Sequence, residues 1–447
     1  MRFVNATVAG SMRGDLPWRQ AGNLVDDNKY LCLPAESVAQ VFFLRTYAFA
    51  GAETLYAVQA RASTNDNSSS SFPSPAATAA AAAAGVKMQG VLAVGMAGLA
   101  IAEGDGDVMA LARRRYGGTL RRIGEVIGKH GDGGGRGEET VAAVVLMGMF
   151  EMIACRDAAS LEAWICHVQG AAALIRHWTS EDWERSVNAR AFLHFFYLLA
   201  TGCLIKKMPV PTHVRDLARS CPAFVADAHL LPARRLFDIL CRFAELHSFG
   251  ETSHVTLLTE RVSAAIMLEE ELCSWETQLP TMWNYNLVRD NSDQGESDQY
   301  MRHKYTCPWQ AYVWTQHRTC RVLVHTALLG YLDALALRMT NAHPALIKAY
   351  ILQQEASREV LCTTMRDLRA GMAYILGLYD EGKGNACLSP EQSGVFGLLG
   401  AVQALMGVGG VVRGEEKEKE EEEWLCGMLG DMGRRWGIGL ATVLGRK

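Results

Sequence analysis

Residues 160–178 read Ser-Leu-Glu-Ala-Trp-Ile-Cys-His-Val-Gln-Gly-Ala-Ala-Ala-Leu-Ile-Arg-His-Trp, and this stretch predicts a helix that packs against its neighbours. Its larger apolar side chains recur every three or four residues, which places them along one face of an α-helix. These side chains are Leu161, Trp164, Ile165, Val168, Ala172 and Ile175. Gly170 and the alanines beside it offer a small-residue surface that a second helix can approach closely, and Ser160 is placed to cap the first turn. The stretch contains no catalytic pattern, so we expect it to serve packing.

The same helical periodicity continues along most of the chain. The other segments predicted to be helical are 35–61, 106–128, 138–155, 181–205, 232–248, 253–279, 309–340, 343–379 and 390–407. The polar stretch 284–306 is expected to form a loop. Because no alternating strand of useful length and no repeat is present, we predict an all-α fold. We expect one large domain of roughly ten or more helices, with no sheet of more than two short strands.

Composition divides the chain into five parts. They are an N-terminal tail (1–29), a helical segment (30–61), a low-complexity linker (62–85), a main helical domain (86–412) and a C-terminal part with an acidic run and a helix (413–447). The Ser- and Pro-rich stretch 63–75 is expected to be disordered. The alanine run 76–84 that follows fits either a flexible extension or the frayed start of a helix. The acidic run 414–423 favours a solvated loop or helix end over an activation segment.

Charge excludes one broad class of function. The 447 residues carry a formal net charge of −4, so the chain has no overall basic field with which to hold nucleic acid. The arginines at 113–115, 121 and 122 are expected to form one solvated helix face. We therefore expect no sequence-specific DNA binding by this chain alone.

The cysteines predict no metal site. The chain has 12 cysteines, but no two of them are separated by only two residues, so neither a zinc ribbon nor a finger is predicted. Most lie in apolar helical runs, which favours buried reduced thiols and a nuclear or cytosolic compartment. The His-Glu-x-x-His and Gly-x-Ser-x-Gly motifs are absent as well, so we predict no catalytic residue, no metal and no cofactor.

Two apolar stretches have a length that invites comparison with a membrane span. Lys87 and Gln89 interrupt residues 76–102, and six glycines lower the helix propensity of residues 394–412. We interpret both stretches as core helices and expect no membrane contact.

The order Trp-x-x-His-x-x-Gly-Ala-x-x-Leu-Ile-Arg in residues 160–178 closely resembles the fungal-specific transcription factor domain. This domain is the helical regulatory region that follows six-cysteine binuclear zinc clusters. The motif residues are Trp164, His167, Gly170, Ala171 and Leu174. Four further segments look like other motifs of the family in the expected order, and the likeness spans roughly residues 86–380. These segments are 112–120, 142–151, 203–211 and 309–325.

The chain departs from the family at its DNA-binding element. Only Cys32 precedes Cys155, so the zinc cluster is absent and neither zinc nor base recognition follows from the resemblance. Two explanations remain open: a regulator that works without its own DNA-binding domain, or a chain from which an upstream exon is missing.

The resemblance implies a transcriptional regulator in the nucleus, with the cytoplasm as a second compartment. It would act through contacts with other transcription factors, through self-association or by sensing an effector, and such factors often control metabolic or secondary-metabolite gene clusters. The alternatives are an all-α enzyme and a membrane-associated helical protein.

One predicted helix carries a candidate regulatory face. Trp314, Arg318, Arg321 and His325 are spaced by four, three and four residues, so they lie on one side of the helix. The simpler interpretation is a solvated or ion-paired face. The sharper one is a partner surface or a pocket for an anionic effector, because two arginines can hold a carboxylate by charge-assisted hydrogen bonds.

Overall fold

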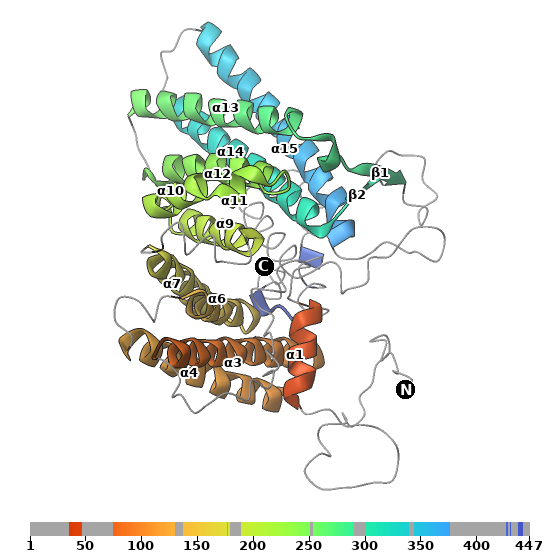
Figure 1. The fold of residues 1–447 in the computed structure, drawn as a ribbon. Coiled ribbons are helices and arrows are strands. Elements are labelled where there is room, and N and C mark those ends of the chain that lie inside the picture. The colour runs from red at the N-terminus through yellow and green to blue at the C-terminus, as the bar shows by residue number, and fades with distance from the viewer. Residues whose placement is uncertain are drawn as a thin grey trace.

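Twelve α-helices, one short 3₁₀ helix (Thr281–Trp283) and one short hairpin form the regular structure in the part of the chain that the computed structural model describes (Figure 1). This part comprises residues 35–46, 75–129, 137–176, 178, 189–250, 254–289, 301–338, 344–375, 426–427, 430 and 437–440. The all-α prediction is confirmed. Within these ranges the only sheet has two strands, β1 (Asn286–Arg289) and β2 (Met301–Lys304).

The hairpin corrects the prediction of a loop over 284–306. Its strands are antiparallel, with Leu287 opposite His303. Two strands of four residues are too short to show clear alternation of apolar and polar side chains. A tertiary contact holds them instead: the rings of Tyr285 and His303 lie 4.2 Å apart, and β2 packs against the last long helix.

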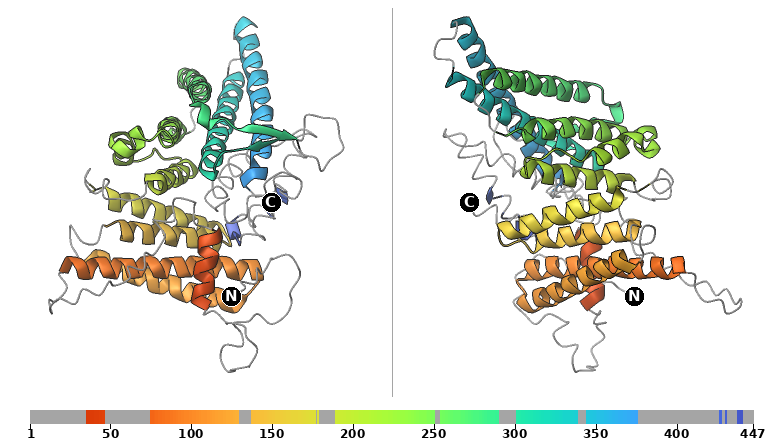
Figure 2. Two further views of the ribbon diagram at one scale, coloured as in Figure 1. Left: turned by 45° about the vertical axis from the view of Figure 1, so that its right-hand side comes forward. Right: turned by 90° about the vertical axis from the view of Figure 1, so that its left-hand side faces the viewer.

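The helices stack in the order of the chain (Figures 1 and 2). The first layer contains α1 (Ala35–Thr46), α3 (Pro75–Glu103) and α4 (Gly106–Lys129). α3 and α4 lie side by side, and α1 crosses α3 so closely that a Cβ atom at Gly95 would clash with the carbonyl oxygen of Ala39. Glycine is therefore required at this crossing.

The start of α3 shows that the alanine run at 76–84 is helical, one of the two alternatives left open by the sequence. The helix begins at Pro75, within the expected linker. The arginines predicted to form a solvated face of α4 do so at Arg113, Arg114, Arg121 and Arg122, all of which are exposed. Arg115 is half-buried and forms an ion pair with Glu36 of α1.

The second layer consists of α6 (Glu138–Ile153) and α7 (Ala158–Ile175). α6 starts with two glutamates, as its dipole favours. The cap of α7 differs from the prediction: Asp157 is the N-cap, and its carboxylate accepts a hydrogen bond from the backbone N–H of Ser160 at 3.1 Å. Ser160 lies three residues inside the helix instead.

The remaining helices form the upper layers in Figure 1. They are α9 (Ala189–Ile205), α10 (Thr212–Ser220), α11 (Pro222–Ala226), α12 (Leu231–Ser248), α13 (Val255–Thr277), α14 (Pro308–Ala336) and α15 (Pro344–Ile375). α12 packs against α9, α13 and α14, while α15 packs against α14 and β2. One continuous apolar core connects these layers.

The C-terminal residues 437–440 return to the lower layers. Ile438 and Leu440 are buried in the common core. Gly437 has a φ of +65° and lies against the carbonyl of Gly98 in α3 so closely that a Cβ atom would clash with it. The backbone of this segment therefore fits a notch that no larger residue at position 437 would enter.

One described helical segment, Gly85–Glu103, is long and apolar enough to cross a membrane, with a mean hydropathy of 1.5. However, 72% of it is buried inside the protein, and its Lys87 forms a 2.7 Å ion pair with Glu139. These properties are those of a core helix, as predicted. The other predicted features at 63–74, 390–412 and 414–423 lie outside the described residues.

Candidate functional site

The motif at 160–178 lies at the contact between α7 and α6. Trp164 is 2% exposed, Ala171 is buried and Leu174 is half-buried. A Cβ atom at Gly148 of α6 would lie 3.3 Å from both Cδ1 of Trp164 and Cβ of His167. The close approach of the two helices is therefore made at Gly148.

Gly170 does not make this contact, contrary to the prediction. It is exposed, and the nearest atom that an added Cβ would meet is Cγ1 of Val144 at 4.0 Å. The apolar stripe was predicted correctly, and Ala171 and Ala172 beside Gly170 are buried, but the glycine at the close contact belongs to α6.

His167 belongs to a polar cluster that joins three helices. The hydroxyl of Tyr116 on α4 donates a hydrogen bond to Glu151 on α6 and lies 3.0 Å from Nε2 of His167. Burial raises the pKa of Tyr116, and the hydrogen bond to Glu151 raises it further; burial lowers the pKa of His167. The tyrosine thus remains a neutral donor at neutral pH. The three residues come from three of the segments that carry the family resemblance.

The predicted regulatory face of α14 points into the protein. Trp314 and Arg318 are buried, and the Arg318 guanidinium lies 5.1 Å from the Trp314 ring and 5.2 Å from the ring of Tyr285. Its Nη1 donates a hydrogen bond to the hydroxyl of Tyr305. Within the described ranges, no carboxylate forms an ion pair with Arg318, and its Nη2 has no hydrogen-bond partner.

The other half of this face is ion-paired with α13. Nε of Arg321 lies 3.1 Å from Glu269, and Nε2 of His325 lies 3.2 Å from the same carboxylate. Burial alone would raise the pKa of Glu269, but the hydrogen bonds from His325 and Arg321 outweigh it and hold this pKa at about 2. Arg321 is thus occupied by Glu269, and Arg318 is enclosed by aromatic rings. Trp314, Arg318 and His325 are buried and Arg321 is half-buried, so little of this face is accessible to an anionic effector or a partner.

The aromatic rings around Arg318, which we call the Arg318 cage, lie next to Gly371 on α15; they belong to Tyr285, Tyr305 and Trp314. A Cβ atom at Gly371 would lie 2.9 Å from the hydroxyl of Tyr305 and 3.1 Å from Nη1 of Arg318, both of which are fixed by the cage. We expect Gly371→Ala to lower the free energy of unfolding by about 1–3 kcal/mol, as overpacking does. Gly330→Ala on α14 is the control: nothing lies within 4 Å of it, and it should gain up to about 1 kcal/mol. Equal urea midpoints for the two variants would contradict this packing.

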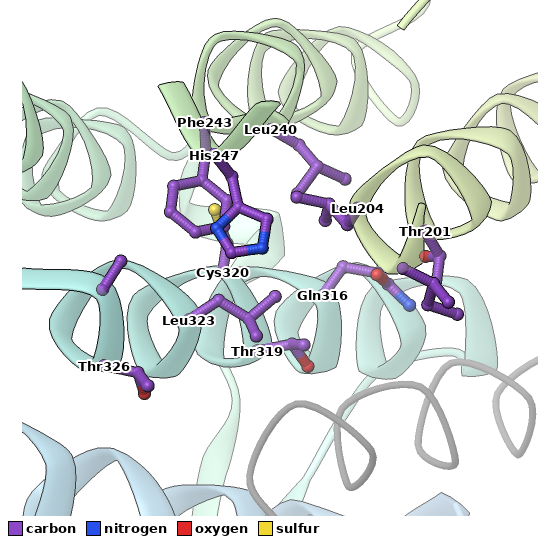
Figure 3. Close-up of a pocket in the computed structure, with 12 residues that line it drawn as sticks. Thr201, Leu204, Leu240, Phe243, His247, Gln316, Thr319, Cys320, Leu323 and Thr326 are labelled. Atoms are coloured by element: carbon purple, nitrogen blue, oxygen red, sulfur yellow. The ribbon is translucent and has the colours of Figure 1, made fainter. Parts of the chain in front are cut away.

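A cavity of about 300 Å³ lies on a different side of α14, between α9 and α12 (Figure 3). We call it the apolar pocket. Its lining residues are Thr201, Leu204, Ile205, Leu240, Phe243, His247, Gln316, Thr319, Cys320, Leu323, Thr326 and Ala327. Volume and composition resemble those of small-molecule sites, which are mostly apolar with a few placed polar groups.

Gln316 is a buried polar group of this pocket whose amide nitrogen lacks a hydrogen-bond partner. It is 4% exposed, extends from α14 toward α9 (Figure 3), and its Nε2 has no hydrogen-bond partner. The hydroxyls of Thr319 and Thr326 already donate to the carbonyls of Thr315 and Val322, at 2.7 and 2.6 Å. Gln316 is therefore a donor that a bound molecule could satisfy.

The titratable groups of the pocket are neutral at pH 7. Burial lowers the pKa of His247, with a further contribution from Lys207, and its ring stacks on Phe243 at 5.7 Å. Burial, helped by the charge of Glu269, raises the pKa of the Cys320 thiol to about 12, so this thiol is not a nucleophile. The arrangement is suited to binding an uncharged molecule.

Comparison with protein-family models, curated proteins and solved structures finds no match for this chain. In the described part of the chain, no group of three His, Cys, Asp or Glu residues could hold a metal ion. The described cysteines are all free. Five of the ten described cysteines are buried, at 155, 203, 221, 241 and 320, and Cys307 and Cys426 are half-buried. The expectation of a buried thiol fails at Cys166, Cys273 and Cys362, which are exposed.

Proposed function

We propose that this protein is a transcriptional regulator that resembles the regulatory region of fungal zinc cluster factors and responds to a small molecule in the apolar pocket. The observation that carries the effector role is the buried amide of Gln316, which lacks a partner inside an otherwise apolar cavity. The regulatory role is supported by the order of the five motifs and by the contact among Tyr116, Glu151 and His167.

α14 connects the apolar pocket to other parts of the fold, so ligand binding could change the positions of neighbouring elements. One side of this helix lines the pocket, and another holds the Arg318 cage and the Glu269 ion pair. A ligand that binds one position of α14 more tightly than another would shift the hairpin and α13 together with it. The protein would then act through contacts with other transcription factors or with a second copy, in the nucleus.

A strain that lacks the gene tests this proposal. Deletion should change the transcripts of a coordinated gene set, and the wild-type gene should restore them. Leu323→Trp fills the pocket from α14 and is expected to fail to restore regulation. Leu257→Trp is the matched control because Leu257 is 44% exposed on α13.

Circular dichroism and thermal melting of the purified variants check that both are folded. If the folded Leu323→Trp variant restores every transcript as well as the control does, the pocket plays no part in regulation. If deletion changes no transcripts, the protein is not a regulator under the conditions used.

A further inference from the structure

We infer that the apolar pocket takes a neutral, largely apolar small molecule with one hydrogen-bond-accepting oxygen, such as a ketone or lactone carbonyl, and that Gln316 donates to this oxygen. The inference rests on the proposed function, because it names the class of effector for the same pocket.

The walls of the pocket carry no charged side chain, so they favour a neutral ligand over an ion. Among the residues that line the pocket there is no lysine, arginine, aspartate or glutamate. The two arginines that could hold an anion, Arg318 and Arg321, are committed to the aromatic cage and to Glu269 on other sides of α14. A carboxylate in the pocket would lose its hydration without gaining a partner. A neutral ligand carries no such cost.

The hydrogen-bonding groups select for an acceptor. A buried amide N–H without a partner costs free energy, which a carbonyl oxygen within reach of Gln316 would recover. The hydroxyl protons of Thr319 and Thr326 are already donated to the helix backbone. Gln316 is therefore the buried group that can still donate to a ligand, and a ligand carbonyl is an acceptor that fits it.

The size and the walls select for a small apolar skeleton. About 300 Å³ is at the lower end of the range for ligand pockets. Leu204 and Leu240 line one part of the cavity, and Phe243 with His247 lines the part above Cys320 (Figure 3). The aromatic and branched walls favour a flat one- or two-ring molecule over a long flexible chain.

Prodan, a neutral fused-ring ketone whose fluorescence shifts to the blue in apolar surroundings, is a suitable probe. We expect saturable binding to the full chain with a blue shift. Gln316→Leu should raise the dissociation constant about 3- to 10-fold, because the hydrogen bond to the ligand is lost. Leu323→Trp should abolish binding. Gln278→Leu, at an exposed glutamine beyond the end of α13, is the control and should leave binding unchanged.

The second arm uses 6-(dimethylamino)-2-naphthoate, which replaces the ketone by a carboxylate on the same ring system. It should bind at least about 10-fold more weakly than prodan because the pocket offers no cation. Equal or tighter binding of the carboxylate overturns the neutral class, and an unchanged constant for Gln316→Leu overturns the role of Gln316. No saturable binding of prodan overturns the inference as a whole.

These outcomes are separable from the failure of the proposed function. If prodan does not bind but Leu323→Trp still loses transcriptional control, the ligand class is wrong and the regulatory pocket stands. If prodan binds as expected but Leu323→Trp keeps control, the pocket is a ligand site without a regulatory role.

Discussion

Replacement of Trp164 by alanine is expected to lower the free energy of unfolding by about 3–5 kcal/mol. The indole is 2% exposed and packs where α7 meets α6, so its removal leaves a cavity in the second helical layer. Urea unfolding at pH 7, followed by circular dichroism at 222 nm, measures the loss. A loss below about 1 kcal/mol would show that this residue is not part of the core.

The same helix contact makes a paired prediction for two glycines. Gly148→Leu should cost about 1–3 kcal/mol or more, because even its Cβ atom would lie only 3.3 Å from Trp164 and His167. Gly170→Leu should be neutral or should stabilise by up to about 1 kcal/mol, because the site is open and leucine is the better helix former. Equal destabilisation by the two substitutions would contradict the contact described here.

Acidification from pH 7 to pH 5 is expected to lower the free energy of unfolding by about 5–6 kcal/mol. Burial lowers the pKa of His194, His303 and His317 to about 3, whereas in the unfolded chain each titrates near 6.5. Below pH 6.5 the unfolded state therefore binds protons at these histidines that the folded state does not bind. The free energy of unfolding falls as the pH falls. Urea midpoints at intervals of half a pH unit measure the slope.

The control for this prediction is His317→Gln. His317 stacks on Trp275 at 4.6 Å, and its Nε2 lies 3.0 Å from the carbonyl oxygen of Leu272, a contact that a glutamine amide can also make. The variant should lose about a third of the pH dependence, because His194 and His303 keep their lowered pKa values. Glu269 does not interfere, because its stabilising contribution is lost only at lower pH, below its unfolded pKa of 4.5. A flat profile between pH 7 and pH 5 in the wild type would contradict the burial of the three histidines.

The helices could be predicted because their signal is local. The expected helix over 106–128 is α4 (Gly106–Lys129), and the expected helix over 232–248 is α12 (Leu231–Ser248). In each case the apolar positions recur at the helical period, and a cap or proline marks an end. The hairpin was missed because its register depends on a contact between Tyr285 and His303 that the local sequence does not encode.

The site was harder to predict because it depends on which faces meet. The spacing of four residues correctly predicted that they lie on one side of a helix: Trp314, Arg318, Arg321 and His325. Because two of them are arginines, we expected this side to face solvent. The structure covers them with α13, α15 and the hairpin. The apolar pocket could not be predicted, because three helices contribute to it and the motif-like segments of α9 and α14 do not show which of their side chains meet around a cavity.

A crystal structure of the full chain with prodan would show whether the apolar pocket binds a neutral carbonyl compound. We predict density for the flat ring system in the pocket between α9, α12 and α14, with its carbonyl oxygen about 3 Å from Nε2 of Gln316. Ligand binding in the apolar pocket would be contradicted by a cavity that Leu323 and Phe243 fill, or by a probe that lies elsewhere or is absent. The role of Gln316 would be contradicted by an amide that is paired with a protein group.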